Sequence, residues 1–275
     1  MKKLLLLTGI ISITIPLVGY SQSDTLLINN EKIPCTLKEI TADAIRYTFP
    51  GEDLLNTIYK NSVQKIIYRN GRIQTFSEST SLKNVNSVDE FENVNLTAVE
   101  SEVKGLFKLG DVSAKAKGAT SLSNQERVKE RAYRKMKIEA AMMGANIIYL
   151  THQRSEGNKF GFFQSSNAET SLTGLAYTNQ LPQYDDFINL VGSRKDFVTI
   201  AVNKMWSSDA DVSRTSTKKT FKIINILNDN GIVTIEGQLS GETSYNKFRL
   251  SNFTNEVFSI YYKDKSTAYN YEIKF

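Results

Sequence analysis

Short runs of alternating apolar and polar residues, separated by turn residues, fill residues 24–77. Each run has the length of a β-strand, and Asn70-Gly71 stands between two of them. An Asn-Gly pair flanked by alternating apolar residues is the strongest short-range signal for a hairpin. About five or six short strands in this range predict a small, strongly bent sheet or an open barrel.

The pattern changes to a helical period after Ser123, inside a module that we expect to span residues 95–205. Ser123 and Glu126 have the spacing of a capping box, and Gly144 is suited to end a helix. The apolar residues between them would form one buried face: Val128, Ala132, Tyr133, Met136, Ala140 and Met143. Further strands are expected in this module, including residues 147–150, 173–177 and 197–202. We therefore predict an α+β module with one long helix packed on a sheet.

Alternation with a period of two returns over residues 220–275 and predicts an antiparallel meander of about five strands or a small sandwich. In its last strand one face is apolar and is expected to be buried: Tyr269, Tyr271, Ile273 and Phe275. The other face carries Asn270, Glu272 and Lys274 and is expected to meet solvent. The polar stretches 78–94 and 206–219 are interpreted as linkers. The predicted fold class is thus α+β, β-rich and multi-module.

The first 21 residues have the pattern of a secretory signal peptide. Lys2 and Lys3 precede an uncharged apolar run, and small residues at Gly19 and Ser21 mark a cleavage site near Ser21. The run is shorter than the ~20 apolar residues of a membrane-spanning helix. We therefore expect an exported protein, periplasmic or extracellular, with no transmembrane segment after cleavage.

Charge and cysteine content narrow the classes of partner. Removing residues 1–21 takes away two lysines, so the formal net charge falls from +5 to +3. This mild charge gives no reason to expect a nucleic-acid partner. Cys35 is the only cysteine, so no disulfide can form within the chain. We interpret Cys35 as a small apolar residue in a strand, with an intermolecular disulfide as the alternative.

Two stretches resemble known families. The strand pattern of residues 24–77 resembles SH3-like and Sm-like small barrels. The corner from Glu139 to Tyr149, with Gly144-Ala145-Asn146 between a helix and an apolar strand, resembles YbjQ-like proteins and Rcs-sensor-lipoprotein-like envelope domains. These are small α+β domains, some described as metal-binding and some as stress sensors. The resemblance implies an exported bacterial envelope protein, although this chain lacks the sensor family's cysteines and lipid anchor.

The residues that catalysis or metal binding would need are scarce. His152 is the only histidine, and a Ser–His–Asp triad or Cys–His pair would need a partner that no motif places beside it. Zinc prefers three or four His or Cys ligands, and no nucleotide-binding glycine motif occurs. The acidic pairs Asp185-Asp186 and Asp209 with Asp211 lack the spacing of a calcium loop and are interpreted as solvated acids. We therefore predict no catalytic, metal or cofactor-binding residues and no cofactor.

Two surfaces are candidates for binding. The polar side of the predicted helix carries Arg127, Arg131, Arg134 and Lys135, which could meet an anionic lipid or polymer. The alternative is an ordinary solvated face with local ion pairs. The stretch 157–164 holds three phenylalanines that would form a partner or membrane contact if exposed, or an edge strand if buried: Phe160, Phe162 and Phe163.

The favoured hypothesis is a non-enzymatic envelope protein that acts by binding or sensing, with the middle module as the recognition element. Its partner would be an envelope protein or polymer, and a peripheral membrane contact is compatible with the sequence. One alternative is a hydrolase of an envelope or extracellular polymer, acting through carboxylates that the sequence does not place. Another is a structural or assembly protein that offers free sheet edges to partner strands.

Overall fold

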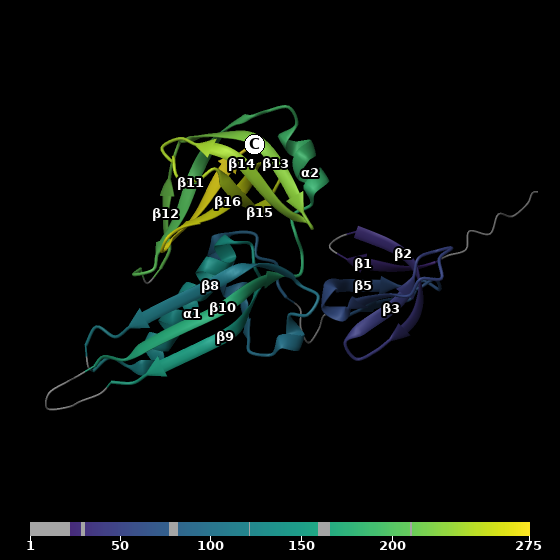
Figure 1. Cartoon of the computed structure of the whole chain (residues 1–275), viewed down its shortest axis with the longest axis horizontal. Helices are drawn as coiled ribbons and strands as arrows, with labels where there is room; N and C mark the ends of the chain where they lie inside the picture. The colour runs from purple at the N-terminus through teal and green to yellow at the C-terminus, as the bar shows by residue number, and fades with distance from the viewer. Residues whose placement is uncertain (1–22, 29–30, 77–81, 121, 159–165, 210) are drawn as a thin grey trace, which may run out of the picture.

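The computed structural model describes residues 23–28, 31–76, 82–120, 122–158, 166–209 and 211–275. It contains three sheets and one long helix, which confirms the predicted β-rich α+β class (Figure 1). The expected signal peptide and the three phenylalanines of residues 160–163 lie outside the described residues.

The N-terminal sheet has six antiparallel strands in the order β4-β3-β2-β1-β5-β6. Their bounds are β1 Asp24–Ile28, β2 Glu31–Ile40, β3 Ala44–Thr48, β4 Asn56–Tyr59, β5 Val63–Ile67 and β6 Ile73–Thr75. The first half of β2 pairs with β1 and the second half with β3, so this long strand links the two parts of the sheet. The core of the N-terminal sheet contains Leu26, Cys35, Ile45 and Ile66, all without exposed surface. The hairpin predicted at Asn70-Gly71 joins β5 to β6.

The middle sheet has four strands in the order β7-β9-β10-β8, and α1 covers one of its faces. The bounds are β7 Asn95–Thr97, β8 Phe107–Lys117, α1 Gln125–Met142, β9 Ile147–Glu156, β10 Glu169–Thr178 and, further on, α2 Tyr184–Val191. Only β7 runs parallel to its neighbour, β9. The predicted apolar face of α1 is buried, except that Tyr133 is half-buried.

Both ends of α1 follow local chemistry, although the N-cap differs from the prediction. Asn124, not Ser123, caps the helix, because its side-chain oxygen accepts from the backbone N–H groups of Glu126 and Arg127. The Ser123 hydroxyl instead accepts from the N–H of Thr120. The helix stops before Gly144, as predicted, and Gly144 has a φ of +82°. A Cβ there would lie 2.5 Å from the carbonyl oxygen of Ser251, so only glycine permits this close approach.

Part of the expected linker 78–94 belongs to the core of the middle sheet. A 3₁₀ segment spans Val88–Asn93, and four apolar side chains of this stretch pack in the same buried cluster as α1: Val85, Val88, Phe91 and Val94. These four residues recur at every third position, which is the period of a 3₁₀-helix and not that of an α-helix or a strand. The interpretation of the stretch as a linker, made from its polar residues, did not use this spacing.

The C-terminal sheet has seven strands in the order β12-β11-β13-β14-β15-β16-β17, and β11 also pairs with β17 and closes it. The bounds are β11 Asp196–Trp206, β12 Ser213–Ser216, β13 Thr220–Asp229, β14 Ile232–Leu239, β15 Lys247–Phe253, β16 Val257–Asp264 and β17 Thr267–Lys274. The strand expected at 197–202 thus joins this sheet rather than the middle one, and β12 lies inside the expected linker 206–219. Phe187 of α2 packs against Phe253, Phe258 and Phe275 at one end of the sheet.

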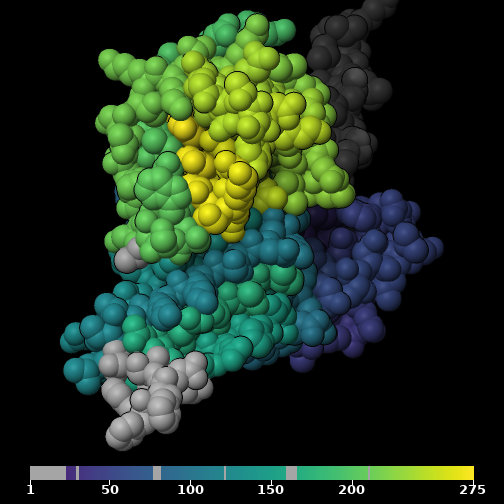
Figure 2. Space-filling view, turned by 60° about the vertical axis from the view of Figure 1, so that its left-hand side comes forward, coloured from purple at the N-terminus to yellow at the C-terminus, as the bar shows by residue number. Residues whose placement is uncertain are grey.

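The closed sheet sits directly on α1, as the contact between the yellow-green and teal surfaces in Figure 2 shows. Ser251 and Asn270 donate hydrogen bonds of 2.8 and 2.9 Å to the carbonyl oxygen of Met142, one of the unpaired carbonyls at the helix end. Asn270, expected to meet solvent, is therefore buried at 3% exposure, and Glu272 beside it pairs with Arg214. Sequence alternation separates the two faces of β17 but does not show what covers each face.

Candidate binding cleft between the N-terminal and middle sheets

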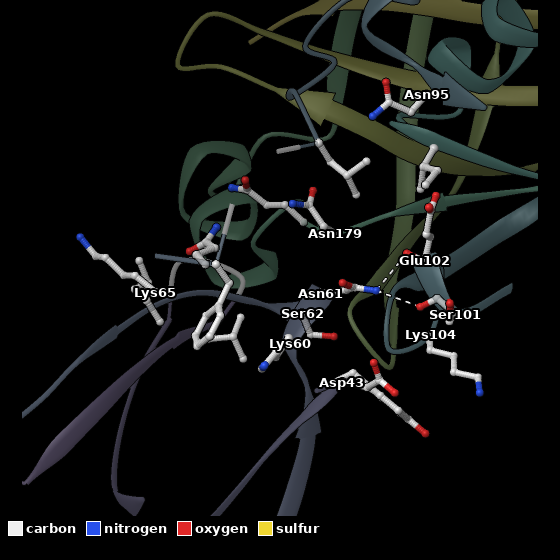
Figure 3. A pocket seen from close by; sticks show the side chains of 18 of the residues that line it. Asp43, Lys60, Asn61, Ser62, Lys65, Asn95, Ser101, Glu102, Lys104 and Asn179 are labelled. Atoms are coloured by element: carbon white, nitrogen blue, oxygen red, sulfur yellow. Dashed lines mark hydrogen bonds between the residues drawn. The ribbon is translucent and has the colours of Figure 1, made fainter. Parts of the chain in front are cut away.

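A cleft of about 940 Å³ lies between the N-terminal sheet and the middle sheet (Figure 3). One wall is the segment from Tyr59 to Lys65, which includes the 3₁₀ turn Lys60–Ser62. The opposite wall comes from β7, the turn Glu100–Glu102 and residues 179–180, which follow β10. The volume is within the roughly 300–1,000 Å³ range of small-molecule sites.

Three hydrogen bonds join the two walls at one side of the cleft. Asn61 Nδ2 donates to the carbonyl oxygens of Ser101 and Glu102 at 3.1 and 3.0 Å, as the dashed lines in Figure 3 show. The Ser62 hydroxyl donates to the carbonyl oxygen of Gly105. Gly105 has a φ of +78°, and a Cβ at this position would lie 2.7 Å from Ser62 Oγ and from Tyr59 Cβ. Glycine at 105 is therefore what allows the walls to meet.

The lining is polar and carries charges of both signs. The charged residues that line the cleft are the cations Lys60, Lys65 and Lys104 and the carboxylates Asp43 and Glu102. Side-chain amides come from both walls, including Asn61, Asn95, Asn179 and Gln180. Apolar surface is limited to a few side chains such as Tyr59, Phe76 and Leu82. The cleft therefore presents hydrogen-bonding groups without a strong charge of one sign.

A smaller pocket of about 260 Å³ adjoins the cleft and shares Asn84 and Gln180 with it. Its walls come from the corner Gly144 to Asn146, the loop before α2 and the end of β15. Asn146 is 2% exposed, and its Nδ2 donates to Asn179 Oδ1 at 2.6 Å. The two hollows thus meet at a pair of hydrogen-bonded amides. We call this smaller hollow the inner pocket.

The structure brings together three of the four basic residues proposed as an anionic contact. Arg127, Arg131 and Arg134 line a groove of about 780 Å³ along α1, together with Lys137. The inclusion of Lys135 was wrong: it is buried at 5% exposure, and its ammonium donates to the carbonyl oxygens of Lys115 and Ser207. Burial lowers the pKa of Lys135 below its usual value.

The charges of this groove are partly neutralised. Arg134 pairs with Glu92 and Asp211 and lies over the ring of Phe91 at 4.3 Å. Lys137 also pairs with Glu92, and Arg131 donates to the carbonyl oxygen of Lys117. These ion pairs connect α1 with residues distant in the sequence, whereas the predicted pairs were local ones, of which Lys129 with Glu126 at 4.0 Å is an example. Binding of an anionic surface by the groove stays a prediction.

The other residues considered for chemistry lie apart. His152 is exposed on β9, and Cys35 is buried in the N-terminal core, where burial raises its pKa to about 11. Asp185 and Asp186 lie in the first turn of α2, and Asp209 accepts from the backbone N–H of Trp206. Within the ranges that the structure describes, no group of three or more His, Cys, Asp or Glu side chains is placed to hold a metal ion.

The cleft residues were not recognised in the sequence. They come from separate short stretches between positions 27 and 180, and no sequence motif connects these stretches. The nearest sequence signal was the Gly144-Ala145-Asn146 corner, whose asparagine lies at the junction of the cleft and the inner pocket. Its significance depends on Asn179, which is 33 residues away.

Comparison with protein-family models, curated proteins and solved structures gave no match. The resemblances noted for residues 24–77 and 139–149 therefore stay predictions. None of the helices in the described part of the chain is both long and apolar enough to span a membrane.

Proposed function

We propose that this chain is a non-enzymatic, exported binding protein whose ligand occupies the cleft between the N-terminal and middle sheets. The observation that carries the proposal is a large polar hollow at the meeting of two separate sheets, with both walls supplying hydrogen-bonding side chains. Ligand sites occur preferentially at such junctions. The signal-type pattern of residues 1–21 supports export to the periplasm or beyond.

The test compares ligand binding by the chain 24–275 with binding by a variant whose cleft is filled. Ala42 is exposed and lines the cleft, so Ala42→Trp fills space there without disturbing a core. Thr57→Trp is the matched control, because Thr57 is exposed on β4 of the same sheet but does not line the cleft. Soluble oligosaccharides, peptidoglycan fragments and short peptides are the probes.

We expect Ala42→Trp to abolish binding of whichever probe binds, and Thr57→Trp to leave it unchanged. Equal binding by both variants would contradict the proposal. The same samples test the alternative of a hydrolase, because Asp43 and Glu102 are carboxylates of the cleft. New reducing ends or cleaved peptide bonds that disappear in Asp43→Asn and Glu102→Gln would favour that alternative.

A further inference from the structure

The amide pair between the cleft and the inner pocket has a fixed orientation. The backbone N–H of Asn146 donates to the carbonyl oxygen of Tyr177, and its own carbonyl oxygen accepts from the N–H of Asn95. Asn146 is therefore held by β10 on one side and by β7 on the other. Its side chain, 2% exposed, donates to Asn179 Oδ1 at 2.6 Å.

This contact determines which end of Asn179 can meet a ligand. A side-chain amide has one acceptor oxygen and one donor NH₂ group. Because the oxygen of Asn179 accepts from Asn146, the NH₂ group is turned away from Asn146 and can donate to a ligand in the cleft that Asn179 lines (Figure 3), while the oxygen keeps a second lone pair. Asn146 thus orients Asn179, which lines the cleft, and Asn146 itself also lines the inner pocket.

The contact between Asn146 and Asn179 has an energetic cost. Asn146 Oδ1 is buried and has no hydrogen-bond partner among the described residues. An unsatisfied buried acceptor costs about 1–3 kcal/mol, and native structures contain few such groups. Asn146 lines the inner pocket, so a ligand there would have this unpaired oxygen as a neighbouring acceptor.

The lining of the inner pocket and the neighbouring cleft wall indicates the chemical class of ligand. The polar groups of these two surfaces are mostly side-chain amides, which both donate and accept hydrogen bonds, as sugar hydroxyls do. These amides are Asn84, Asn86, Asn95, Asn146, Asn179 and Gln180. Asp186 is the one ionisable group among the described residues that line the inner pocket. The cleft is lined by three lysines and two carboxylates, so neither hollow carries a strong charge of one sign to select a strongly charged ligand.

The sizes of the two hollows add to this picture. The inner pocket, at about 260 Å³, is just below the roughly 300–1,000 Å³ of drug-sized ligand sites, which suits one ring-sized unit. The cleft, at about 940 Å³, has room for a chain, and the aromatic side chains of Tyr59 and Phe76 are among those that line it. We propose that the protein binds a neutral oligosaccharide, with its terminal sugar in the inner pocket and the chain extending through the cleft. This inference rests on the proposed function of the cleft.

A peptide is the rival ligand, and the structure favours it less. A peptide commonly binds as an added strand, with main-chain bonds along a sheet edge and pockets for alternate side chains. The edge strand at the cleft, β7, has three residues, and the lining is polar rather than a row of apolar pockets. An added strand would therefore form few bonds and find little apolar surface.

The test measures binding by isothermal titration calorimetry on the chain 24–275. The probes are neutral oligosaccharides of four to six glucose, mannose or N-acetylglucosamine units, with short peptides and polygalacturonate as the competing classes. Asn179→Asp keeps an oxygen for Asn146 and replaces the NH₂ group by a second acceptor. Asn189→Asp is the control of equal charge, because Asn189 is exposed on α2 and does not line either hollow.

We expect a neutral oligosaccharide to bind, Asn179→Asp to weaken it about tenfold or more, and Asn189→Asp to leave it unchanged. The positioning role predicts non-additivity: Asn146→Ala and Asn179→Ala each weaken binding, and the double variant loses less than the sum of the two single losses. Additive losses would overturn the positioning role, since a merely structural defect at Asn146 would add to the loss at Asn179.

The outcomes separate this inference from the proposed function. If Ala42→Trp abolishes binding but Asn179→Asp does not change it, the cleft binds ligand and the inference is wrong. Binding of peptides or polygalacturonate in preference to every neutral oligosaccharide, or no oligosaccharide binding at millimolar concentration, would overturn the ligand class. Binding unaffected by Ala42→Trp would reject the cleft itself.

Discussion

Removing the lysine of the ion pair between α1 and the closed sheet should destabilise the protein strongly. Glu139 and Lys263 lie 2.5 Å apart, with side-chain exposures of 3% and 33%. Burial and, secondarily, the charge of Glu139 raise the pKa of nearby Tyr261. The carboxylate therefore sits in the docking surface, while its partner reaches water.

The two single variants should differ because their partners differ in burial. Lys263→Met leaves a buried carboxylate without its cation, and breaking a buried pair in this way costs about 3–5 kcal/mol. Glu139→Gln leaves an ammonium that is one-third exposed and can be hydrated, so we expect a loss of about 1–2 kcal/mol. The double variant should lose less than the sum of the single losses, because the uncompensated charge is absent.

Urea unfolding followed by tryptophan fluorescence measures these losses. Trp206 is the only tryptophan and lies at the end of β11, so its signal reports on the closed sheet. Lys265→Met, in the turn between β16 and β17, is a control for the loss of one surface lysine. A cost for Lys263→Met below about 1 kcal/mol, or equal to that of Glu139→Gln, would refute this account of the docking surface.

Two other predictions concern the N-terminal core and the groove on α1. Burial raises the pKa of Cys35 from 9.0 to about 11, so the folded state keeps a proton that the unfolded chain releases between these pH values. Stability should therefore fall by about 1.9 kcal/mol from pH 9 to 11, and Cys35→Ala should show a shallower fall in urea titrations; equal slopes would contradict this. In the groove, the double variant Arg127→Ala/Arg131→Ala should weaken binding to phosphatidylglycerol vesicles at low salt by about thirtyfold, at ~1 kcal/mol per basic residue removed. Unchanged sedimentation with vesicles would show that the groove is an ordinary solvated helix face.

Local signals in the sequence were sufficient for the elements whose boundaries are determined by neighbouring residues. Gly144 ends α1 because the left-handed backbone there suits glycine. Asn70-Gly71 forms the turn between β5 and β6. The cap at Asn124 instead of Ser123 is a difference of one residue between two good capping side chains.

Partners distant in the sequence were not predictable. The alternation in β11 identifies a strand, but its hydrogen bonds go to β12, β13 and β17, all of which follow it. Lys135 lies beside the apolar face of α1, and it is buried because β8 and Ser207 supply carbonyl oxygens for its ammonium. The cleft depends in the same way on contacts such as Asn61 with Ser101, 40 residues apart.

The central claim is that ligand binds between the N-terminal and middle sheets, and hydrogen exchange with mass spectrometry tests it most directly. With a bound oligosaccharide, backbone amides of residues 59–65 and 95–105 should exchange more slowly, because these segments form the two walls. Amides of residues 124–137, which line the groove on α1, should be unchanged. Protection confined to residues outside both walls, with 59–65 exchanging as in the free protein, would contradict the account.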